Sequence, residues 1–368
     1  MTERNRDSLM AALARVVDPT FERPMVQLGT IVDARSEGDG VVVDVRLAAP
    51  GDATRTAIRS RIEEALAATG ITKVDVHWNL QVPSRETMGD DPLPEVRNLI
   101  LVMSGKGGVG KSTCAVNIAT ALQLMGARVG LLDADIYGPS IPTMMGIHEA
   151  PRATDTQKIG PLERFGVKLM SIGFLLEDPK TAIVWRGPML HSALGQFLAD
   201  VEWGALDYLV IDLPPGTGDV ALTISQRLKS TVAVLITTPQ EVALQDVYKG
   251  VSMCEKLSIP ILGVIENMSY FIDTAGVRHE LFGSGGGQKV ADHAKAPLLG
   301  QIPIETDVRQ WGDEGTPIVR AAPGASAAKE LITVAERIAE RIAQEHFKRA
   351  GGERVPEGKA RTRLRILR

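Results

Sequence analysis

Residues 105–113 read Gly-Lys-Gly-Gly-Val-Gly-Lys-Ser-Thr, and this stretch decides the fold. An apolar run at 99–103 precedes it, and a helical pattern at 114–125 follows it. A strand, a glycine-rich turn and a helix in this order predict a phosphate-binding P-loop, because glycine lets the backbone approach the anion and the helix N-terminus points N–H groups at it. We predict nucleotide contacts from Gly105, Lys106, Gly107, Gly108, Val109, Gly110, Lys111, Ser112 and Thr113.

The two lysines of this loop have different predicted roles. Lys111 supplies positive charge to the β- and γ-phosphates, and Ser112 supplies a hydroxyl ligand to Mg²⁺. Lys106 lies at the start of the loop, where it could stabilise transition-state charge if a second subunit presents it. The alternative is a solvated loop lysine.

The composition is that of a globular protein of about two domains, with 368 residues, 44% of them hydrophobic, and a net charge of −4. This charge argues against a nucleic-acid or membrane-surface protein. No apolar run reaches the roughly 18 residues of a membrane-spanning helix, and residues 1–10 lack the apolar core of a signal peptide, so we predict a cytoplasmic protein. Two cysteines are too few for a disulfide framework, and the six histidines show no metal-ligand spacing.

Hydrophobic patterns predict a small α/β module over residues 5–80, followed by a proline-containing linker at 81–97. Residues 98–345 then alternate apolar strands with helices. Near-continuous apolar strands are typical of parallel sheets buried on both faces, so we predict an α/β fold with a doubly wound parallel sheet. Its ligand site should lie at the carboxyl ends of the strands. Residues 346–368 are rich in Lys and Arg, and we expect a disordered basic tail.

Carboxylates follow two of the predicted strands. Asp133 and Asp135 end the strand after the P-loop helix, and Asp212 ends a later strand with a Pro-Pro-Gly turn behind it. Residues i and i+2 of a strand point to one face, so Asp133 and Asp135 can both reach the water shell of Mg²⁺. We predict that Asp133 and Asp212 hold the metal with Ser112, partly through water. Gly216 is predicted to place an N–H near the γ-phosphate.

Asn267 follows another strand, in the segment Glu266-Asn267-Met268-Ser269. Its amide carries a donor and an acceptor side by side, which matches the amino group and ring nitrogen of adenine. A turn residue at a strand end is an equally good interpretation of this position.

Together these motifs resemble the deviant Walker A ATPases of the ParA/MinD class and, within it, the Mrp/ApbC group of iron–sulfur cluster carriers. The N-terminal Asp18-Pro19 and the segment 27–29 resemble the PaaD-like module of iron–sulfur assembly proteins. The resemblance covers residues 8–342. It rests on the segments 105–113, 133–140, 185–189, 212–219, 266–269 and 282–286.

The resemblance implies a homodimer that binds two ATP molecules, with Mg²⁺, at its interface and hydrolyses them slowly. Lys106 would reach the partner's nucleotide, and Lys111 and Asp135 would assist hydrolysis. Asn267 would read adenine. The resemblance also implies that the protein binds an iron–sulfur cluster and transfers it to apoprotein clients.

The cysteines depart from this pattern. Cluster-carrying members usually have a C-x-x-C pair after the Glu-Asn-Met-Ser segment, where this chain has no cysteine, so no iron–sulfur ligand is identifiable. We expect both cysteines, Cys114 and Cys254, to lie in the core, and Asp273 and His279 are weak candidates for hard ligands. The alternative function is a cluster-free, nucleotide-switched dimer that binds or regulates a protein partner.

Overall fold

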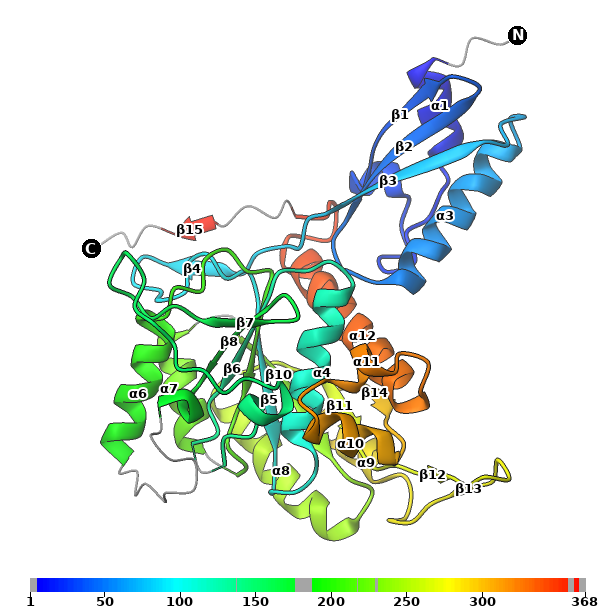
Figure 1. The fold of residues 1–368 in the computed structure, drawn as a ribbon. Helices are drawn as coiled ribbons and strands as arrows, with labels where there is room; N and C mark the ends of the chain where they lie inside the picture. Colours follow the sequence, from blue (N-terminus) through cyan, green and yellow to red (C-terminus); the bar gives the residue numbers. More distant parts are fainter. Residues whose placement is uncertain are drawn as a thin grey trace. The chain divides into compact units, whose positions relative to one another are not determined.

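The computed structural model describes residues 5–136, 138–175, 187–216, 218–228, 231–356 and 361–363. The chain divides into two compact units (Figure 1). Unit 1 comprises Met1–Ser84 and Ala339–Lys359, and unit 2 comprises Arg85–Ile338 and Ala360–Arg368. The predicted division into module, linker, ATPase domain and tail stays a prediction.

Unit 1 contains a three-stranded sheet in the order β1–β2–β3, with β1 antiparallel and β3 parallel to β2. Leu9, Leu13, Ile58 and Ile62 bring the helices onto this sheet to form one buried core. Unit 1 thus contains both helices and strands, as expected of an α/β module. In β1 only Ile31 and Ala34 are buried, so its sequence carries little hydrophobic pattern. The elements are α1 (Arg6–Leu13), α2 (Met25–Leu28), β1 (Ile31–Glu37), β2 (Gly40–Leu47), α3 (Asp52–Ala67) and β3 (Val74–Leu80).

The last helix, α12 (Ser326–Arg349), contributes to both units, since the residues after 338 cluster with unit 1. Within unit 1, Thr54 Oγ1 lies 2.6 Å from Glu340 Oε1, and the rings of Phe21 and Phe347 lie 4.9 Å apart. The helix therefore continues past the boundary predicted at residue 345, because Phe347 is still buried. Residues 357–360 and 364–368 of the predicted tail lie outside the described residues.

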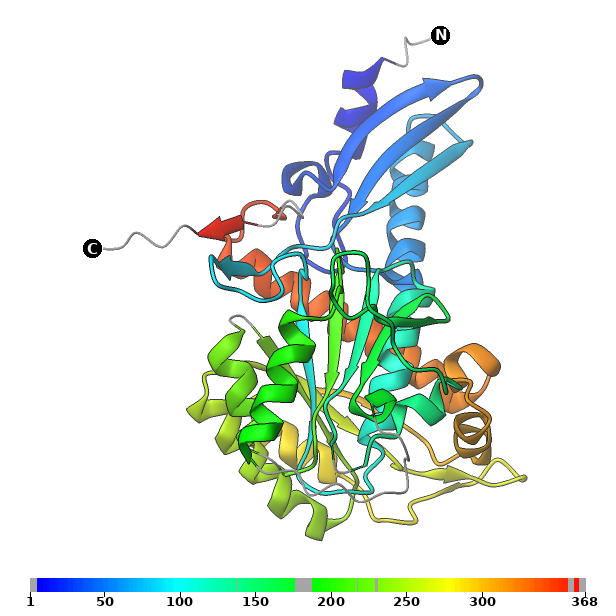
Figure 2. The same cartoon turned by 60° about the vertical axis from the view of Figure 1, so that its left-hand side comes forward.

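Unit 2 is built on an eight-stranded sheet in the order β14–β11–β10–β5–β9–β6–β8–β7, with helices on both faces (Figure 2). All neighbouring strands are parallel except the edge strand β7, which is antiparallel to β8. The predicted doubly wound parallel sheet is thus confirmed. The strands are β5 (Leu99–Ser104), β6 (Val129–Asp133), β7 (Leu162–Arg164), β8 (Val167–Ser171), β9 (Tyr208–Asp212), β10 (Thr231–Thr237), β11 (Ile261–Glu266) and β14 (Leu298–Gln301).

The remaining elements of unit 2 are mostly the helices that connect these strands. Two short ladders lie apart from the main sheet: β4 (Glu86–Met88) with β15 (Arg361–Arg363), and β12 (Phe271–Ile272) with β13 (Arg278–His279). The helices are α4 (Lys111–Leu124), α5 (Ile141–Met144), α6 (Gly187–Ala199), α7 (Gly218–Arg227), α8 (Glu241–Lys256), α9 (Gly286–His293), α10 (Thr306–Asp313) and α11 (Ile318–Ala321), with a 3₁₀ turn at Ile172–Leu175.

The stretch predicted as a linker contains a buried ion pair. Arg85 Nη1 lies 2.5 Å from Asp91 Oδ2, and both side chains are almost completely buried. Arg85 also donates to the carbonyl oxygens of Leu93 at 2.7 Å and Val96 at 3.1 Å. A buried guanidinium needs such partners, and these contacts hold Arg85 at the start of unit 2.

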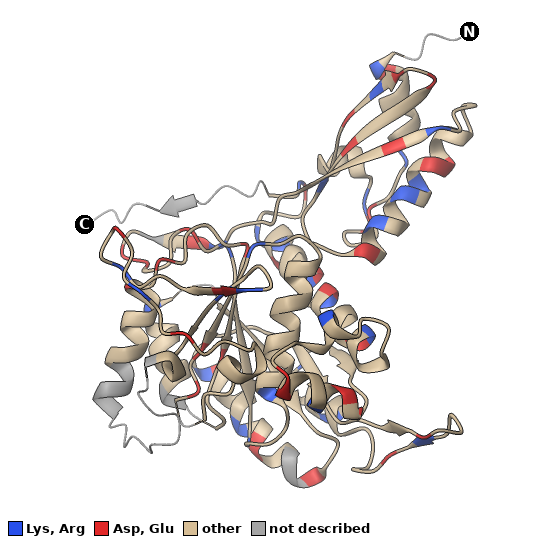
Figure 3. Cartoon of the chain, viewed as in Figure 1, with Lys and Arg blue, Asp and Glu red and all other residues tan. Residues whose placement is uncertain are grey.

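Both α3 and α12 carry charges of both signs (Figure 3). Among the described residues, no helix has the length and apolar character needed to span a bilayer.

Candidate nucleotide-binding site

Parallel strand pairing gathers the predicted site residues at one edge of the sheet. Asp212 lies opposite Val102 of β5 and opposite Asp133 of β6. The P-loop leaves β5 at this same edge, and Asn267 follows β11 there. The predicted site residues therefore lie together at the carboxyl ends of the strands, where a parallel sheet of this kind is expected to bind its ligand.

Glycine is required at two positions of the P-loop for different reasons. Gly110 has φ of +81° at the start of α4, and a Cβ there would overlap the Asn267 amide. Gly105 is packed so tightly against α8 that a Cβ would overlap the backbone of Asp246 and Val247. The loop is thus held between the Asn267 segment and α8 before any ligand binds.

A pair of alanine variants should separate the structural glycine from the ligand-facing one. Gly105→Ala should lower the free energy of unfolding by at least about 2 kcal/mol, because backbone atoms of α8 must move. Gly107→Ala is the matched control: the nearest atom to its Cβ would be Pro215 Cγ at 4.0 Å, so stability should change by less than about 0.5 kcal/mol. Urea unfolding without nucleotide measures both. Equal stabilities would contradict the packing argument.

Lys111 is buried among acidic side chains. Its Nζ lies 2.6 Å from Asp212 Oδ1, 3.4 Å from Asp135 Oδ2 and 3.3 Å from Ser112 Oγ. The structure therefore brings together four of the predicted site residues. Burial raises the pKa of Asp212, while Lys111 and the Ser112 hydroxyl oppose that rise.

Asp133 is buried and held by three hydrogen bonds. Its carboxylate is fully buried and accepts hydrogen bonds from Ser171 Oγ at 2.9 Å, from Asp135 N at 3.1 Å and from Ile141 N at 3.4 Å. Burial, with the nearby Asp212 charge, raises the pKa of Asp133 to about 8. In this structure Asp133 orders the loop that carries Asp135, and its predicted metal role stays a prediction.

Asp135 has one buried carboxylate oxygen without a partner in the described part of the chain. Its Oδ1 atom is buried without a hydrogen-bond partner among the described residues. Such an atom is costly unless water, a cation or a ligand hydrogen satisfies it. Asp135 and Asp212 both pair with Lys111, so carboxylates outnumber the ammonium group here, a balance that suits a divalent cation. Among the described residues, no group of three or more His, Cys, Asp or Glu side chains is placed to hold a metal ion.

Lys106 and Gly216 are two further residues predicted to act near the γ-phosphate. Lys106 is half-buried, and its Nζ forms no ion pair with any described residue. The N–H of Gly216 donates to the Ser104 carbonyl at 3.1 Å, so it must leave that oxygen before it can reach a phosphate. Thr217, beside it, lies outside the described residues, as do Tyr137, Trp185 and Arg186 of the quoted motifs.

Asn267 contacts the P-loop directly. Its Nδ2 donates to the Val109 carbonyl at 2.9 Å, which leaves one amide hydrogen and the amide oxygen for another partner. A cavity of about 850 Å³ opens beside it, and its lining includes Gly110, Thr113 and Arg309. The Asn267 side chain therefore both fixes the P-loop and faces the cavity next to the N-terminus of α4.

Two supporting residues escaped the sequence analysis. Ser171 binds Asp133 across the β6–β8 pair, and only the strand order reveals that proximity. Glu266 is fully buried and accepts bonds from Ser269, Gln301 and the N–H of Gly287. In the sequence, the signal for Glu266 was its place in the Glu-Asn-Met-Ser segment, directly before Asn267.

Both cysteines lie in the core, as predicted. Cys114 is 1% exposed and Cys254 is 0% exposed, and burial raises the pKa of each thiol to about 12. A protonated, buried thiol is a poor iron ligand. Asp273 and His279 pair with each other at 2.7 Å on the exposed β12–β13 hairpin.

Comparison with known protein families shows to which family the chain belongs. A family model described as NUBPL iron-transfer P-loop NTPase matches residues 95–339. The chain belongs to this family. A second model, described as iron-sulfur cluster assembly protein, matches residues 6–78 of this NUBPL-type NTPase. The resemblance inferred from the sequence is thereby confirmed for both parts of the chain.

Relatives of this NUBPL-type NTPase extend over most of its length. A Synechocystis protein named iron-sulfur cluster carrier protein is 42% identical, covering 91% of this chain and 97% of its own. A Deinococcus radiodurans protein of the same name is 45% identical, covering 91% and 95%. An Arabidopsis thaliana protein named iron-sulfur protein required for NADH dehydrogenase, mitochondrial, is 46% identical over 66% of this chain and 78% of its own.

Solved structures match the NTPase part. A nucleotide-binding protein of Archaeoglobus fulgidus in complex with ADP has a TM-score of 0.55 and 40% identity, covering 63% of this chain and 92% of that one. The cell division ATPase MinD of Pyrococcus furiosus has a TM-score of 0.50 at 24% identity, covering 66% and 98%, and shares the fold.

Proposed function

We propose that this protein is an ATP-hydrolysing dimer that delivers iron–sulfur clusters to apoprotein clients. The observation that carries the proposal is the match of both parts of one chain, residues 6–78 and 95–339, to iron–sulfur families. The P-loop constellation supports the nucleotide half of the proposal on independent, geometric grounds.

In the proposed reaction the phosphates of ATP occupy the P-loop. Lys111, which pairs with Asp212 at 2.6 Å, turns its ammonium group to the β- and γ-phosphates. Ser112 and Asp212 would hold Mg²⁺, which neutralises phosphate charge when bound. The adenine base fits the cavity beside Asn267, whose free amide hydrogen and oxygen are available to it.

Asp135 and Lys106 would act on the γ-phosphate. The unpartnered Oδ1 of Asp135 can orient the attacking water. The unpaired ammonium group of Lys106 can stabilise the charge that develops at a partner subunit's nucleotide. Asp135 pairs with Lys111 through its other oxygen, Oδ2, at 3.4 Å, which leaves Oδ1 for the water.

In this scheme the iron–sulfur cluster is the cargo, and the source of its ligands follows from the burial of the two cysteines. Neither cysteine can supply a surface thiolate, since both are buried. Thiolates that hold a cluster would therefore come from the client or another donor, and the protein would present a docking surface whose state depends on ATP.

Anaerobic reconstitution with iron and sulfide, with and without ATP, tests the proposal. Absorbance and iron content measure the cluster, and activation of an apo iron–sulfur protein measures delivery. We expect ATP-dependent transfer to the apoprotein even if little cluster stays on the carrier. Intact ATPase activity with neither uptake nor accelerated transfer would contradict the carrier function.

The buried cysteines favour one second candidate, a cluster-free switch that binds a protein partner according to its nucleotide. ATP should then change the oligomeric state and the pattern of limited proteolysis without any iron. A chain whose sedimentation and proteolysis are the same with and without ATP would exclude this candidate.

A further inference from the structure

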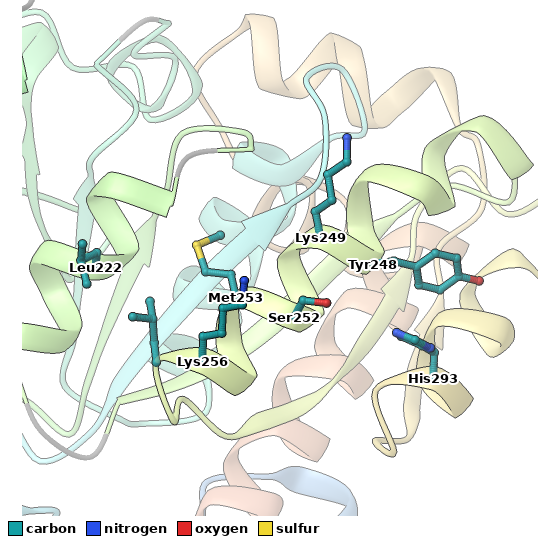
Figure 4. Close-up of a pocket in the computed structure, with 8 residues that line it drawn as sticks. Leu222, Tyr248, Lys249, Ser252, Met253, Lys256 and His293 are labelled. Carbon is teal, nitrogen blue, oxygen red and sulfur yellow. The ribbon is translucent and has the colours of Figure 1, made fainter.

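A second cavity lies along α8 in unit 2, with a volume of about 660 Å³ (Figure 4). It shares no lining residue with the cavity beside Asn267. In Figure 4, Met253 of α8 lies between Leu222 of α7 and the ring pair of Tyr248 and His293. We call this cavity the α8 groove. Its lining residues are Leu222, Tyr248, Lys249, Ser252, Met253, Lys256, Leu257 and His293.

The floor of the α8 groove is apolar and open to solvent. Leu222 is 38% exposed, and Met253 and Leu257 are half-buried. The rings of Tyr248 and His293 lie 4.6 Å apart at one end. Flexible methionine and aromatic side chains suit the reception of an apolar partner surface.

The rim of the α8 groove is basic. Lys249 is 80% exposed, and its one ion pair among the described residues is with Asp246 on its own helix, at 2.9 Å. Lys256 forms no ion pair with any described residue. Exposed pairs of this kind are weak, so both ammonium groups are available to a partner carboxylate.

The groove follows the helix axis. Its α8 residues recur one turn apart, from Tyr248 through Ser252 to Lys256, over a length of about 12 Å at the rise of an α-helix. A partner helix that places one apolar side chain per turn would match this spacing, with acidic residues meeting the lysines.

The α8 groove also adjoins the nucleotide site. Lys249 and Met253 line a smaller cavity of about 150 Å³ that reaches Gly105 and Gly216. The backbone of α8 at Asp246 is in tight contact with Gly105. A displacement of α8 is therefore passed to the first residue of the P-loop.

We propose that the α8 groove binds an acidic amphipathic helix of a partner protein, and that its occupancy changes the rate of ATP turnover. The binding half is independent of the proposed function, whereas the turnover half rests on the proposed ATPase activity. Charge complementarity at Lys249 and Lys256 is the argument for the acidic partner.

The binding test selects helices from a random 16-residue peptide library on the full chain without nucleotide. The Lys249→Glu/Lys256→Glu variant serves for counter-selection. We expect peptides with apolar residues one turn apart and excess Asp and Glu, which bind the double variant at least tenfold more weakly. Lys329→Glu, an exposed charge change outside the groove, is the matched control and should bind them as the native chain does.

Three outcomes would overturn the binding half. These are selected peptides that are basic or uncharged, peptides that bind the double variant equally well, and a Leu222→Glu variant that shifts the monomer–dimer balance in sedimentation. The last would assign the groove to a second copy of this chain.

The turnover test adds the selected peptide to the native chain and to Leu222→Glu. We expect ATP turnover to change at least threefold in the native chain and to stay constant in the variant. Binding without any change in turnover would overturn the coupling, and absence of basal turnover in the native chain would instead contradict the proposed function.

Discussion

Replacing Lys111 by methionine should abolish nucleotide binding and also destabilise the empty protein. Binding is lost because the buried ammonium group that is expected to contact the β- and γ-phosphates is removed, which we expect to weaken ATP affinity at least about a hundredfold. Stability falls because Asp212, 1% exposed, loses the partner 2.6 Å away. Removing one member of a buried ion pair costs about 3 kcal/mol. Calorimetric titration with ATP and urea unfolding measure the two effects.

A double variant separates these effects. Lys111→Met with Asp212→Asn removes the uncompensated carboxylate and should recover most of the lost stability, while ATP binding stays absent. If the double variant is as unstable as the single one, the Lys111–Asp212 pair does not stabilise the fold. If Lys111→Met binds ATP normally, the assignment of the P-loop lysine is wrong.

The parallel sheet could be predicted because its strands are apolar throughout and alternate with helices. Strands such as β5 and β10 are buried at every residue, so their sequences are nearly continuous hydrophobic runs that can be recognised directly. The exposed strand β1 lacks that signal, since only Ile31 and Ala34 of its seven residues are buried. The antiparallel edge strand β7 has no buried residue and was also missed.

The candidate site also has features that the sequence predicts and features that it does not. The P-loop and its aspartates follow apolar strands directly, so their meeting at one sheet edge follows from topology. The hydrogen bond from Ser171 to Asp133 depends on β8 lying beside β6, and that strand order is not expressed in either segment. The Asn267 contact with Val109 likewise joins residues 158 positions apart. The sequence alone did not predict which distant segments lie side by side, because such pairing leaves no local pattern.

Changing Asp135 to asparagine, or Lys106 to alanine, should each lower ATP turnover by about two to three orders of magnitude while ATP still binds. Asp135 loses the negative charge that orients water, and Lys106 loses the charge offered to the partner's nucleotide. Single-turnover hydrolysis and ATP titration distinguish these effects from loss of binding. Either variant hydrolysing ATP at the native rate would remove that residue from the proposed mechanism.

Mixing the two inactive variants decides whether Lys106 acts across the dimer. A heterodimer of Asp135→Asn and Lys106→Ala has one site with an intact Asp135 and an intact Lys106 from the other subunit. Random exchange of equal amounts makes half the dimers mixed, so about a quarter of native turnover should return. If Lys106 served its own subunit, every site would lack one of the two groups, and the mixture would stay inactive. Recovery of turnover therefore requires a composite site, and with it a dimer that closes on ATP.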